Sequence, residues 1–218
     1  MSTLVPNRWL FSLEFPIAYR TRPPKLDGTA RGWAAKERLP KLGSMDGATD
    51  FADVWACWHE SGVYLAVKVT GKRKPLQCDP TRYWDGDNVR LCIDTRDART
   101  NRRATRFCRQ FYFLPRGGGK NGKAPVAGVG TIQRAMAEGP PVPDGALAIA
   151  SSISKGGYFL KAHVSAEALH GFDPDEHPRI GFYLMVEDAE LGQQFPTVGD
   201  DLSWHLDPST WPTAVLSR

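Results

Sequence analysis

The sequence predicts an all-β fold, an antiparallel β-sandwich of the immunoglobulin-like or jelly-roll-like kind. Apolar and polar residues alternate with a period of two in short runs, which places alternate side chains on opposite faces of a sheet. Seven or more such runs occur, with almost no helical periodicity, and this pattern is typical of a sandwich. The 218 residues are 41% hydrophobic and 24% charged, which is enough apolar surface to order a single core.

The N-terminal half contains five predicted strands, each with a set of alternate residues that faces the core. The turn Glu60–Gly62 joins the second and third strands as a hairpin. Arg109 interrupts the fifth face and is expected at a strand end. The core-facing sets are Trp9, Phe11, Leu13 and Phe15; Val54, Ala56 and Trp58; Val63, Leu65, Val67 and Val69; Val89, Leu91 and Ile93; and Phe107, Phe111 and Phe113.

The C-terminal half predicts a second hairpin, a further strand and a closing strand. The hairpin turns at residues 155–157, and a helix of one or two turns is expected at residues 166–170, with Ser165 before it and Gly171 after it. The segment 213–216 closes the sheet. The corresponding alternate residues are Leu147, Ile149 and Ser151; Tyr158, Leu160, Ala162 and Val164; and Phe182, Leu184 and Val186.

The stretch from residue 115 to residue 145 is dense in Gly and Pro, which predicts a long loop and a candidate rim or lid. We divide the chain into an N-terminal strand extension, residues 1–25, packed on the sandwich, and the sandwich itself, residues 26–218. The second part includes the Gly/Pro-rich loop at 115–145.

The charge pattern argues against a nucleic-acid partner and against a membrane. The net charge of +4 comes from Lys and Arg that are spread along most of the chain, so a solvated surface explains them. Residues 1–19 lack a long apolar core, and Glu14 and Pro16 interrupt what apolar character there is, so neither a signal peptide nor a membrane span is expected. A cytoplasmic location follows by default.

The four cysteines are widely separated, and no Cys-x-x-Cys pair suggests a zinc knuckle or a redox pair. Reduced thiols are the expectation for a chain without an export signal. An even number still permits a disulfide, and Cys78 with Cys108 is the first pair to test because both lie at segment ends.

No common catalytic pattern is present, and the chain is not expected to be an enzyme. Residues 117–124 nearly match a phosphate-binding loop, but Ala124 lacks the hydroxyl that would hold magnesium, and Pro125 disfavours helical geometry there. No cofactor is expected. A calcium site built from aspartates is conceivable, although turn formation explains the same residues. These aspartates are Asp85, Asp87, Asp94 and Asp97.

Two tryptophans stand in polar loops and not on an apolar strand face. Trp84 lies in the segment 79–87 and Trp204 in the segment 199–205, both rich in charged residues. Two such indoles can form a slot that stacks on the faces of a sugar ring, with polar neighbours binding the hydroxyls. Each of them alone could also be a packing lid over one end of the sandwich.

Several fragments in the order of this chain resemble a family 9 carbohydrate-binding module, within the wider superfamily that includes the DOMON domains. The strongest is residues 84–94, which begin with Trp84-Asp85-Gly86-Asp87. The others are residues 26–28 with Trp33, residues 53–58, 63–65, 156–158, 181–188 and 203–211. The resemblance covers about residues 26–218 and implies a noncatalytic β-sandwich that binds sugar.

The resemblance also implies which residues contact the ligand. In sugar-binding members, tryptophans at the positions of Trp84 and Trp204 clamp a terminal sugar, and an asparagine aligns with Asp201. The polar partners differ here, because Arg90 replaces a glutamate, Met185 a glutamine and Lys161 an acidic residue. An arginine at position 90 favours an acidic sugar or another anion.

Strand parity completes the candidate site. If Val89 and Leu91 face the core, Arg90 points to the other side, and Gln110 and Tyr112 do the same on the next strand. We therefore expect Trp84 and Trp204 on one side of the sandwich, with these three side chains on the floor between them.

The leading hypothesis is a noncatalytic carbohydrate-binding domain. The alternative is a structural or protein-interaction sandwich that has kept the scaffold and lost the ligand. A third reading is a haem-binding DOMON-like domain in which Met185 and a histidine such as His163 are the axial ligands.

Overall fold

The computed structural model describes residues 6–10 and 12–218 and confirms the all-β fold. The helical segments of these residues are short 3₁₀ turns, and none of them is long and apolar enough to span a membrane. The strands are β1 Glu14–Tyr19, β2 Ala52–His59, β3 Gly62–Thr70, β4 Asn88–Asp94, β5 Cys108–Gly118, β6 Ala124–Gly130, β7 Leu147–Ser154, β8 Gly157–Ser165, β9 Arg179–Asp188, β10 Gly192–Gln194 and β11 Thr213–Ser217. The 3₁₀ turns are η1 Asn7–Leu10, η2 Ala35–Glu37, η3 Gly43–Asp46, η4 Pro80–Arg82, η5 Ala166–Ala168 and η6 Pro208–Thr210.

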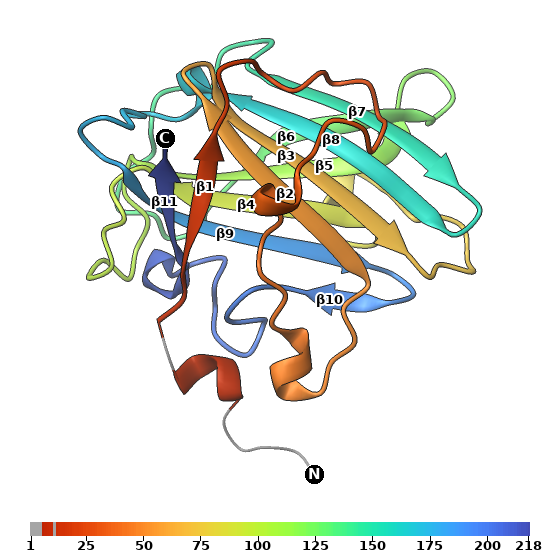
Figure 1. Ribbon diagram of the computed structural model, residues 1–218, viewed down its shortest axis with the longest axis horizontal. Helices are drawn as coiled ribbons and strands as arrows, with labels where there is room; N and C mark the ends of the chain where they lie inside the picture. Colours follow the sequence, from red (N-terminus) through yellow and green to blue (C-terminus); the bar gives the residue numbers. More distant parts are fainter. Residues whose placement is uncertain (1–5, 11) are drawn as a thin grey trace.

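The strands form one continuous hydrogen-bonded sheet that folds back on itself. The order is β6-β5-β4-β9-β11-β1-β2-β3-β8-β7, with β10 paired to β9. Figure 1 shows the two halves as layers, with β2, β3, β7 and β8 lying over β4, β5 and β6. The strands β1 and β11 make the bend between the layers, and the main apolar core fills the space that the two halves enclose.

The first strand is part of this sheet and not an extension packed on it. Residues 14–19 pair in parallel with β11 on one side and with β2 on the other, whereas the remaining ladders are antiparallel. The side chains of Phe15 and Ile17 are buried in the main core. The predicted boundary at residue 25 is therefore wrong, because β1 completes the bend. Phe11, a predicted core residue, lies outside the described residues.

The predicted core faces of the regular strands are confirmed. Trp58, Leu65, Leu91 and Phe111 are all buried in the main core, as period-two alternation requires. Phe107 is an exception because β5 begins only at Cys108, and Trp9 is another because it lies in η1 and packs with the apolar cluster around Trp204. The expected helix at residues 166–170 is the single 3₁₀ turn η5.

Part of the long loop predicted at 115–145 is strand instead. β5 continues to Gly118, and residues 124–130 form β6, which leaves residues 131–146 as the irregular connection. β6 tolerates Pro125 and its glycines because it is an edge strand and needs hydrogen bonds only to β5.

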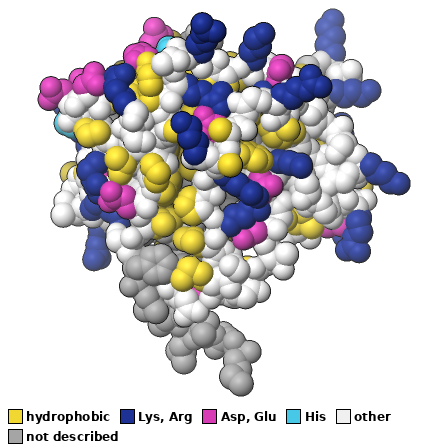
Figure 2. Space-filling model, viewed as in Figure 1, with side chains coloured by type: hydrophobic (Ala, Val, Ile, Leu, Met, Phe, Trp, Pro, Cys, Tyr) yellow, Lys and Arg dark blue, Asp and Glu magenta, His cyan; other side chains and the backbone are white. Residues whose placement is uncertain are grey.

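The outer surface of β1, β2, β3 and β8 is mixed in chemistry. Figure 2 shows Lys and Arg side chains on this face next to acidic and hydrophobic ones. Arg38 and Lys41 both pair with Asp53, and Arg20 pairs with Glu37. These two carboxylates neutralise part of the positive charge on this side.

Candidate functional site

A cavity of about 550 Å³ opens on the outer face of β4 and β5, away from the main core. Three further segments complete its wall: the loop before β4, the residues at the end of β6, and the connection from β10 to β11. Trp84 stands in this wall with half of its surface exposed (50%), so the indole has area free for a ligand. The lining residues are Tyr83, Trp84, Arg90, Gln110, Val129, Thr131, Gln133, Asp200 and His205. We call this cavity the Trp84 pocket.

Two tyrosines and a glycine hold Trp84 in the pocket wall. The Tyr83 ring meets Trp84 edge-on with centroids 5.2 Å apart and stacks on Tyr112 with centroids 4.0 Å apart. A Cβ atom on Gly128 of β6 would lie 2.3 Å from the Tyr112 ring, so that ring can lie against β6 because position 128 is glycine. The sequence of β6 thus helps to place an indole on a different loop.

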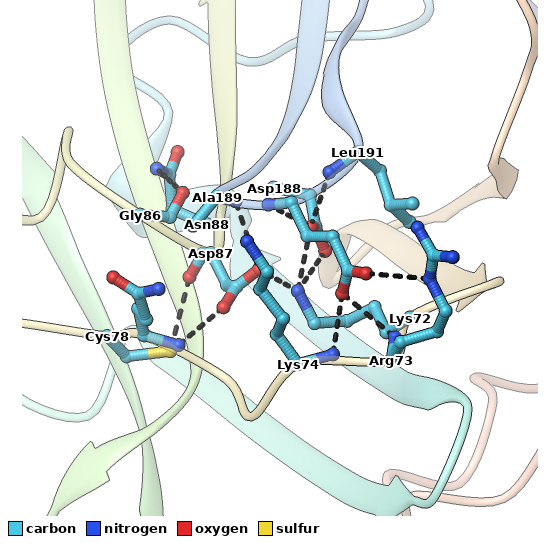
Figure 3. A network of polar contacts seen from close by, with 12 residues as sticks. Lys72, Arg73, Lys74, Cys78, Gly86, Asp87, Asn88, Asp188, Ala189 and Leu191 are labelled. Atoms are coloured by element: carbon cyan, nitrogen blue, oxygen red, sulfur yellow. Dashed lines mark hydrogen bonds and ion pairs between the residues drawn. The ribbon is translucent and has the colours of Figure 1, made fainter.

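The loop that carries Trp84 is anchored by a buried ion network, shown in Figure 3. Lys72 Nζ lies 2.6 Å from Asp87 Oδ1 and 2.7 Å from each carboxylate oxygen of Asp188. Asp87 Oδ2 also accepts a hydrogen bond from the backbone N–H of Gln77. Gly86 adopts a φ of 86°, and a Cβ atom there would lie 2.3 Å from the Gln77 carbonyl oxygen. Trp84 is therefore two residues before Gly86, where the backbone requires glycine, and three residues before Asp87, which the ion network holds in place.

Trp204 lies beneath the pocket and not in its wall. Its side chain is fully buried, and its ring stacks on Tyr183 with centroids 4.7 Å apart. The guanidinium carbon of Arg90 lies 4.9 Å from the centre of the same ring. The predicted slot between two exposed indoles is wrong, because the segment 195–212 folds across the outer face of β9 and buries Trp204 there. The neighbouring His205 lines the pocket instead.

A closed ring of polar contacts joins the pocket floor to this buried tryptophan. Arg90 donates to Glu187, and Gln193 donates to both Glu187 and Asp200, at 3.3 and 3.0 Å. Trp204 Nε1 donates to the other oxygen of Asp200 at 3.2 Å, and Arg90 rests on the Trp204 ring. Each member of the ring thus fixes the orientation of the next.

The ring contains one positive group, Arg90, and two carboxylates, Glu187 and Asp200. Burial tends to raise the pKa of Asp200, but hydrogen bonds from Gln193 and Trp204 and the nearby charge of Arg90 lower it below its ordinary value. Asp200 is therefore ionised at neutral pH. With Glu187 paired to Arg90, the guanidinium has no surplus positive charge to offer an anion.

The parity prediction for the floor is confirmed. Arg90 pairs with Tyr112 and Cys92 pairs with Gln110 across β4 and β5, so Arg90, Gln110 and Tyr112 share the outer face. Arg90 and Gln110 line the pocket directly, and Tyr112 contributes through its stack with Tyr83.

Two other predicted site residues do not line the pocket. Met185 is fully buried under Arg90, with its sulfur 3.1 Å from Nη2. Asp201 is exposed, and its carboxylate accepts a hydrogen bond from the backbone N–H of Gly199. The acidic residue in the pocket is the preceding Asp200. The sequence could not show whether Asp200 or Asp201 faces the pocket, because the segment 199–206 is not a strand and its side chains do not alternate between two faces.

The structure excludes the predicted haem ligand pair. Met185 on β9 and His163 on β8 both point outward, because their strand neighbours Leu184 and Val164 face the core between the layers. The two side chains therefore lie on opposite outer faces of the sandwich. His163 stacks on Tyr64, with centroids 4.1 Å apart.

The aspartates considered for calcium do not come together. Asp87 and Asp94 flank opposite ends of β4, Asp85 pairs with Arg82, and Asp87 is bound to Lys72. Within the described part of the chain, no group of three or more His, Cys, Asp or Glu side chains could hold a metal ion.

Cys78 and Cys108, the pair of cysteines to test first for a disulfide, are both free thiols. Cys78 forms an isolated β-bridge with Gly86 just before β4 begins, whereas Cys108 pairs with Asp94 at the other end of β4. The seven residues of β4 place these two ends roughly 20 Å apart. Burial raises the pKa of each of the two thiols to about 11, so neither is a reactive thiolate at neutral pH.

Comparison with known proteins bears on the fold. No family model and no curated protein matches the sequence. Two solved structures of a family 9 carbohydrate-binding module from Caldicellulosiruptor kristjanssonii are similar to this chain. The complex with cellotriose has a TM-score of 0.62 and 14% sequence identity, with 94% of each chain covered. The complex with glucose has a TM-score of 0.60 and 14% identity, covering 94% of this chain and 96% of that one. At this level of identity the likeness establishes that the chain shares the β-sandwich fold of these modules.

Proposed function

We propose that this domain binds a neutral sugar noncatalytically in the Trp84 pocket. The observation that carries the proposal is a half-exposed indole beside a polar floor whose arginine is already paired with a carboxylate. One face of a pyranose ring presents C–H groups that pack on an aromatic surface, while its hydroxyls need both donors and acceptors. The fold shared with modules solved in complex with cellotriose and with glucose supports the same class of ligand.

The side chains around Trp84 supply the hydrogen bonds that hydroxyls require. Gln110 and Gln133 each offer a carbonyl oxygen and an amide group, and Thr131 offers a hydroxyl. Asp200 accepts and Arg90 donates from the floor. A cavity of about 550 Å³ is within the usual range for small-molecule sites.

A neutral ligand is favoured over an acidic one in this pocket. Arg90 is paired with Glu187 in a part-buried contact, and Asp200 adds a second negative charge nearby. A ligand carboxylate would have to compete with Glu187 for the guanidinium and would meet Asp200. The preference for acidic sugars that an arginine at position 90 suggests is therefore removed by its neighbours.

The pocket favours binding over glycoside hydrolysis. Glycosidases generally place two carboxyl groups on either side of the scissile bond, one of them with a raised pKa. Asp200 is the one acidic residue among those that line this pocket, its pKa is lowered, and both its oxygens accept hydrogen bonds. Asp200 therefore lacks both the raised pKa of a general acid and a second carboxyl group in the pocket to act with it.

The test is isothermal titration with neutral sugars chosen from a glycan array, using the wild-type protein and two variants. Trp84→Ala is expected to weaken binding about ten- to a hundredfold, from about 1 to 3 kcal/mol of stacking by analogy with bases on aromatic side chains. The matched control is Trp55→Ala, because Trp55 is a partly exposed indole on the outer face of β2, in the other layer.

Two outcomes would overturn the proposal. One is a folded wild-type protein that binds no sugar, which would leave the protein-interaction scaffold as the function to pursue. The other is an equal loss of affinity in Trp84→Ala and Trp55→Ala, which would place the ligand elsewhere.

A further inference from the structure

The connection between β4 and β5 contains a dense group of arginines. Six of the fourteen residues from 96 to 109 are Arg, and Asp97 is the one acidic residue among them. This segment, the yellow-green loop on the left in Figure 1, therefore carries a charge of +5, more than the +4 of the whole chain. We call the following residues the arginine cluster: Arg96, Arg99, Arg102, Arg103, Arg106 and Arg109.

Backbone carbonyl groups hold several of these side chains in place. Arg96 Nη1 donates to the Gly171 carbonyl oxygen at 2.6 Å, and Arg103 Nε donates to that of Arg134 at 2.8 Å. A carbonyl orients a guanidinium but does not cancel its charge. The structure thus fixes the positions of positive groups without neutralising them.

Few carboxylates form ion pairs with the cluster. Among the described residues, Arg99 of the cluster forms an ion pair with Asp97, at 3.9 Å. Arg102, Arg103 and Arg106 are exposed and have no carboxylate within ion-pair distance in the described part of the chain. This contrasts with the opposite layer, where arginines pair with aspartate and glutamate.

Two arginines of the cluster converge on one hollow. A cavity of about 510 Å³ is lined in part by Arg96, Arg106 and Phe107. The two guanidinium carbons lie 4.3 and 5.1 Å from the centre of the Phe107 ring, so both charges border the same ring. An anionic group in this hollow would lie beside both positive charges and could accept paired hydrogen bonds from the exposed Arg106.

We propose that the arginine cluster is a second binding surface, specific for an acidic polysaccharide, with a ligand carboxylate or sulfate in the Arg96–Arg106 hollow. A polymer is favoured over a small anion because exposed arginines continue beyond the hollow, at Arg102 and Arg103. This surface is distinct from the Trp84 pocket. It binds the acidic groups of a ligand, which the pocket does not favour.

The aromatic groups of this surface favour polysaccharide over nucleic acid. Single-stranded nucleic acids bind to aromatic rings on which successive bases stack. The ring in the hollow, Phe107, packs against two guanidiniums and stacks on His170, with centroids 5.2 Å apart. Its faces are therefore taken up by these neighbours, whereas the exposed Arg106 guanidinium remains available to acidic groups.

The position of the hollow suits a ligand that also reaches the Trp84 pocket. Thr131 and Gln133 line the pocket, and Met136 and Ala137 line the hollow. An extended chain from residue 131 to residue 136 spans at most about 18 Å, so both sites are within reach of one polysaccharide.

The experiment measures binding of polygalacturonate to the wild-type protein and to charge-matched double variants by isothermal titration at low salt. Arg102→Gln with Arg106→Gln is expected to weaken binding about tenfold or more, because two guanidiniums of the surface are lost. The control is Lys120→Gln with Lys123→Gln, which removes the same charge from the exposed β5–β6 turn and should change affinity less than twofold. Arg106→Lys keeps the charge and should lose part of the affinity.

Equal weakening in the two double variants would overturn the proposal, because attraction would then follow net charge alone. Failure of the wild-type protein to bind polygalacturonate would overturn it as well. Tighter binding of a single-stranded oligonucleotide or of anionic lipid vesicles than of the polysaccharide would refute the assigned partner. Neutral-sugar affinity, measured on the same variants, should stay unchanged, which separates this inference from the proposed function of the Trp84 pocket.

Discussion

Replacing Lys72 with methionine is expected to destabilise the domain by about 3 to 5 kcal/mol at pH 7. The side chains of Lys72, Asp87 and Asp188 are at most 3% exposed, and the ammonium lies 2.6 to 2.7 Å from three carboxylate oxygens. Methionine fills a similar volume without a charge, so two buried carboxylates would lose their cation. Breaking a buried ion pair by removal of one partner typically costs about this much.

The penalty should depend on pH. In the wild-type protein burial tends to raise the pKa of Asp188, but hydrogen bonds from Lys72 and from two backbone N–H groups help to bring it below its ordinary value. Its stabilising effect is present above the unfolded pKa of about 4 and is lost as pH falls through the lowered folded value. Burial already raises the pKa of Asp87.

In Lys72→Met, burial without a cation raises the folded pKa of both carboxyl groups above the unfolded value. The folded variant then binds protons first, so its stability increases as pH falls toward about 4. The difference from wild type should therefore shrink between pH 7 and pH 5.

Urea unfolding followed by tryptophan fluorescence at these two pH values measures both effects. The control is Lys74→Met, an exposed lysine two residues away, which should stay within about 0.5 kcal/mol of wild type. Two results would refute this reasoning: a penalty for Lys72→Met below about 1 kcal/mol at pH 7, or a penalty that grows as the pH falls.

Three further results are expected. Trp58→Ala should cost about 3 to 5 kcal/mol in thermal or urea melts because its buried indole leaves a cavity, while Trp55→Ala should cost far less; the reverse ranking would contradict the core assignment. Gly128→Ala should displace Tyr112 and cost about 1 to 3 kcal/mol, whereas Gly156→Ala, with open space around it, should be nearly neutral in the same melts. The native thiols should react slowly with a disulfide reagent at pH 8, with rapid reaction of Cys78 or Cys108 as the contrary outcome.

The sheet core could be predicted from the sequence because burial imposes parity. Once Val89, Leu91 and Ile93 must face inward, Arg90 has to face outward, and the same argument places Gln110. This reasoning needs only neighbouring residues, which is why it located Arg90 and Gln110 on the pocket floor.

Features that depend on long-range packing were not predictable in this way. Trp204 is buried because an irregular segment crosses the outer face of β9, and no periodicity signals that crossing. The strand β6 was not predicted because Pro125 and the glycines of this segment are typical of loops. They are compatible with a strand only where the strand lies at the edge of a sheet. The spacing of Gly128 and Gly130 could have indicated that another group packs closely on this strand.

The central claim is that a neutral sugar binds against Trp84, and nuclear magnetic resonance of the indole N–H groups tests it most directly. The seven tryptophans supply separate probes distributed over both layers. Titration with a neutral sugar that binds should shift the Trp84 indole signal most, together with the side-chain amide of Gln110, and should leave the Trp55 indole unchanged. A shift confined to Trp55, or saturating binding that leaves the Trp84 signal in place, would contradict the account.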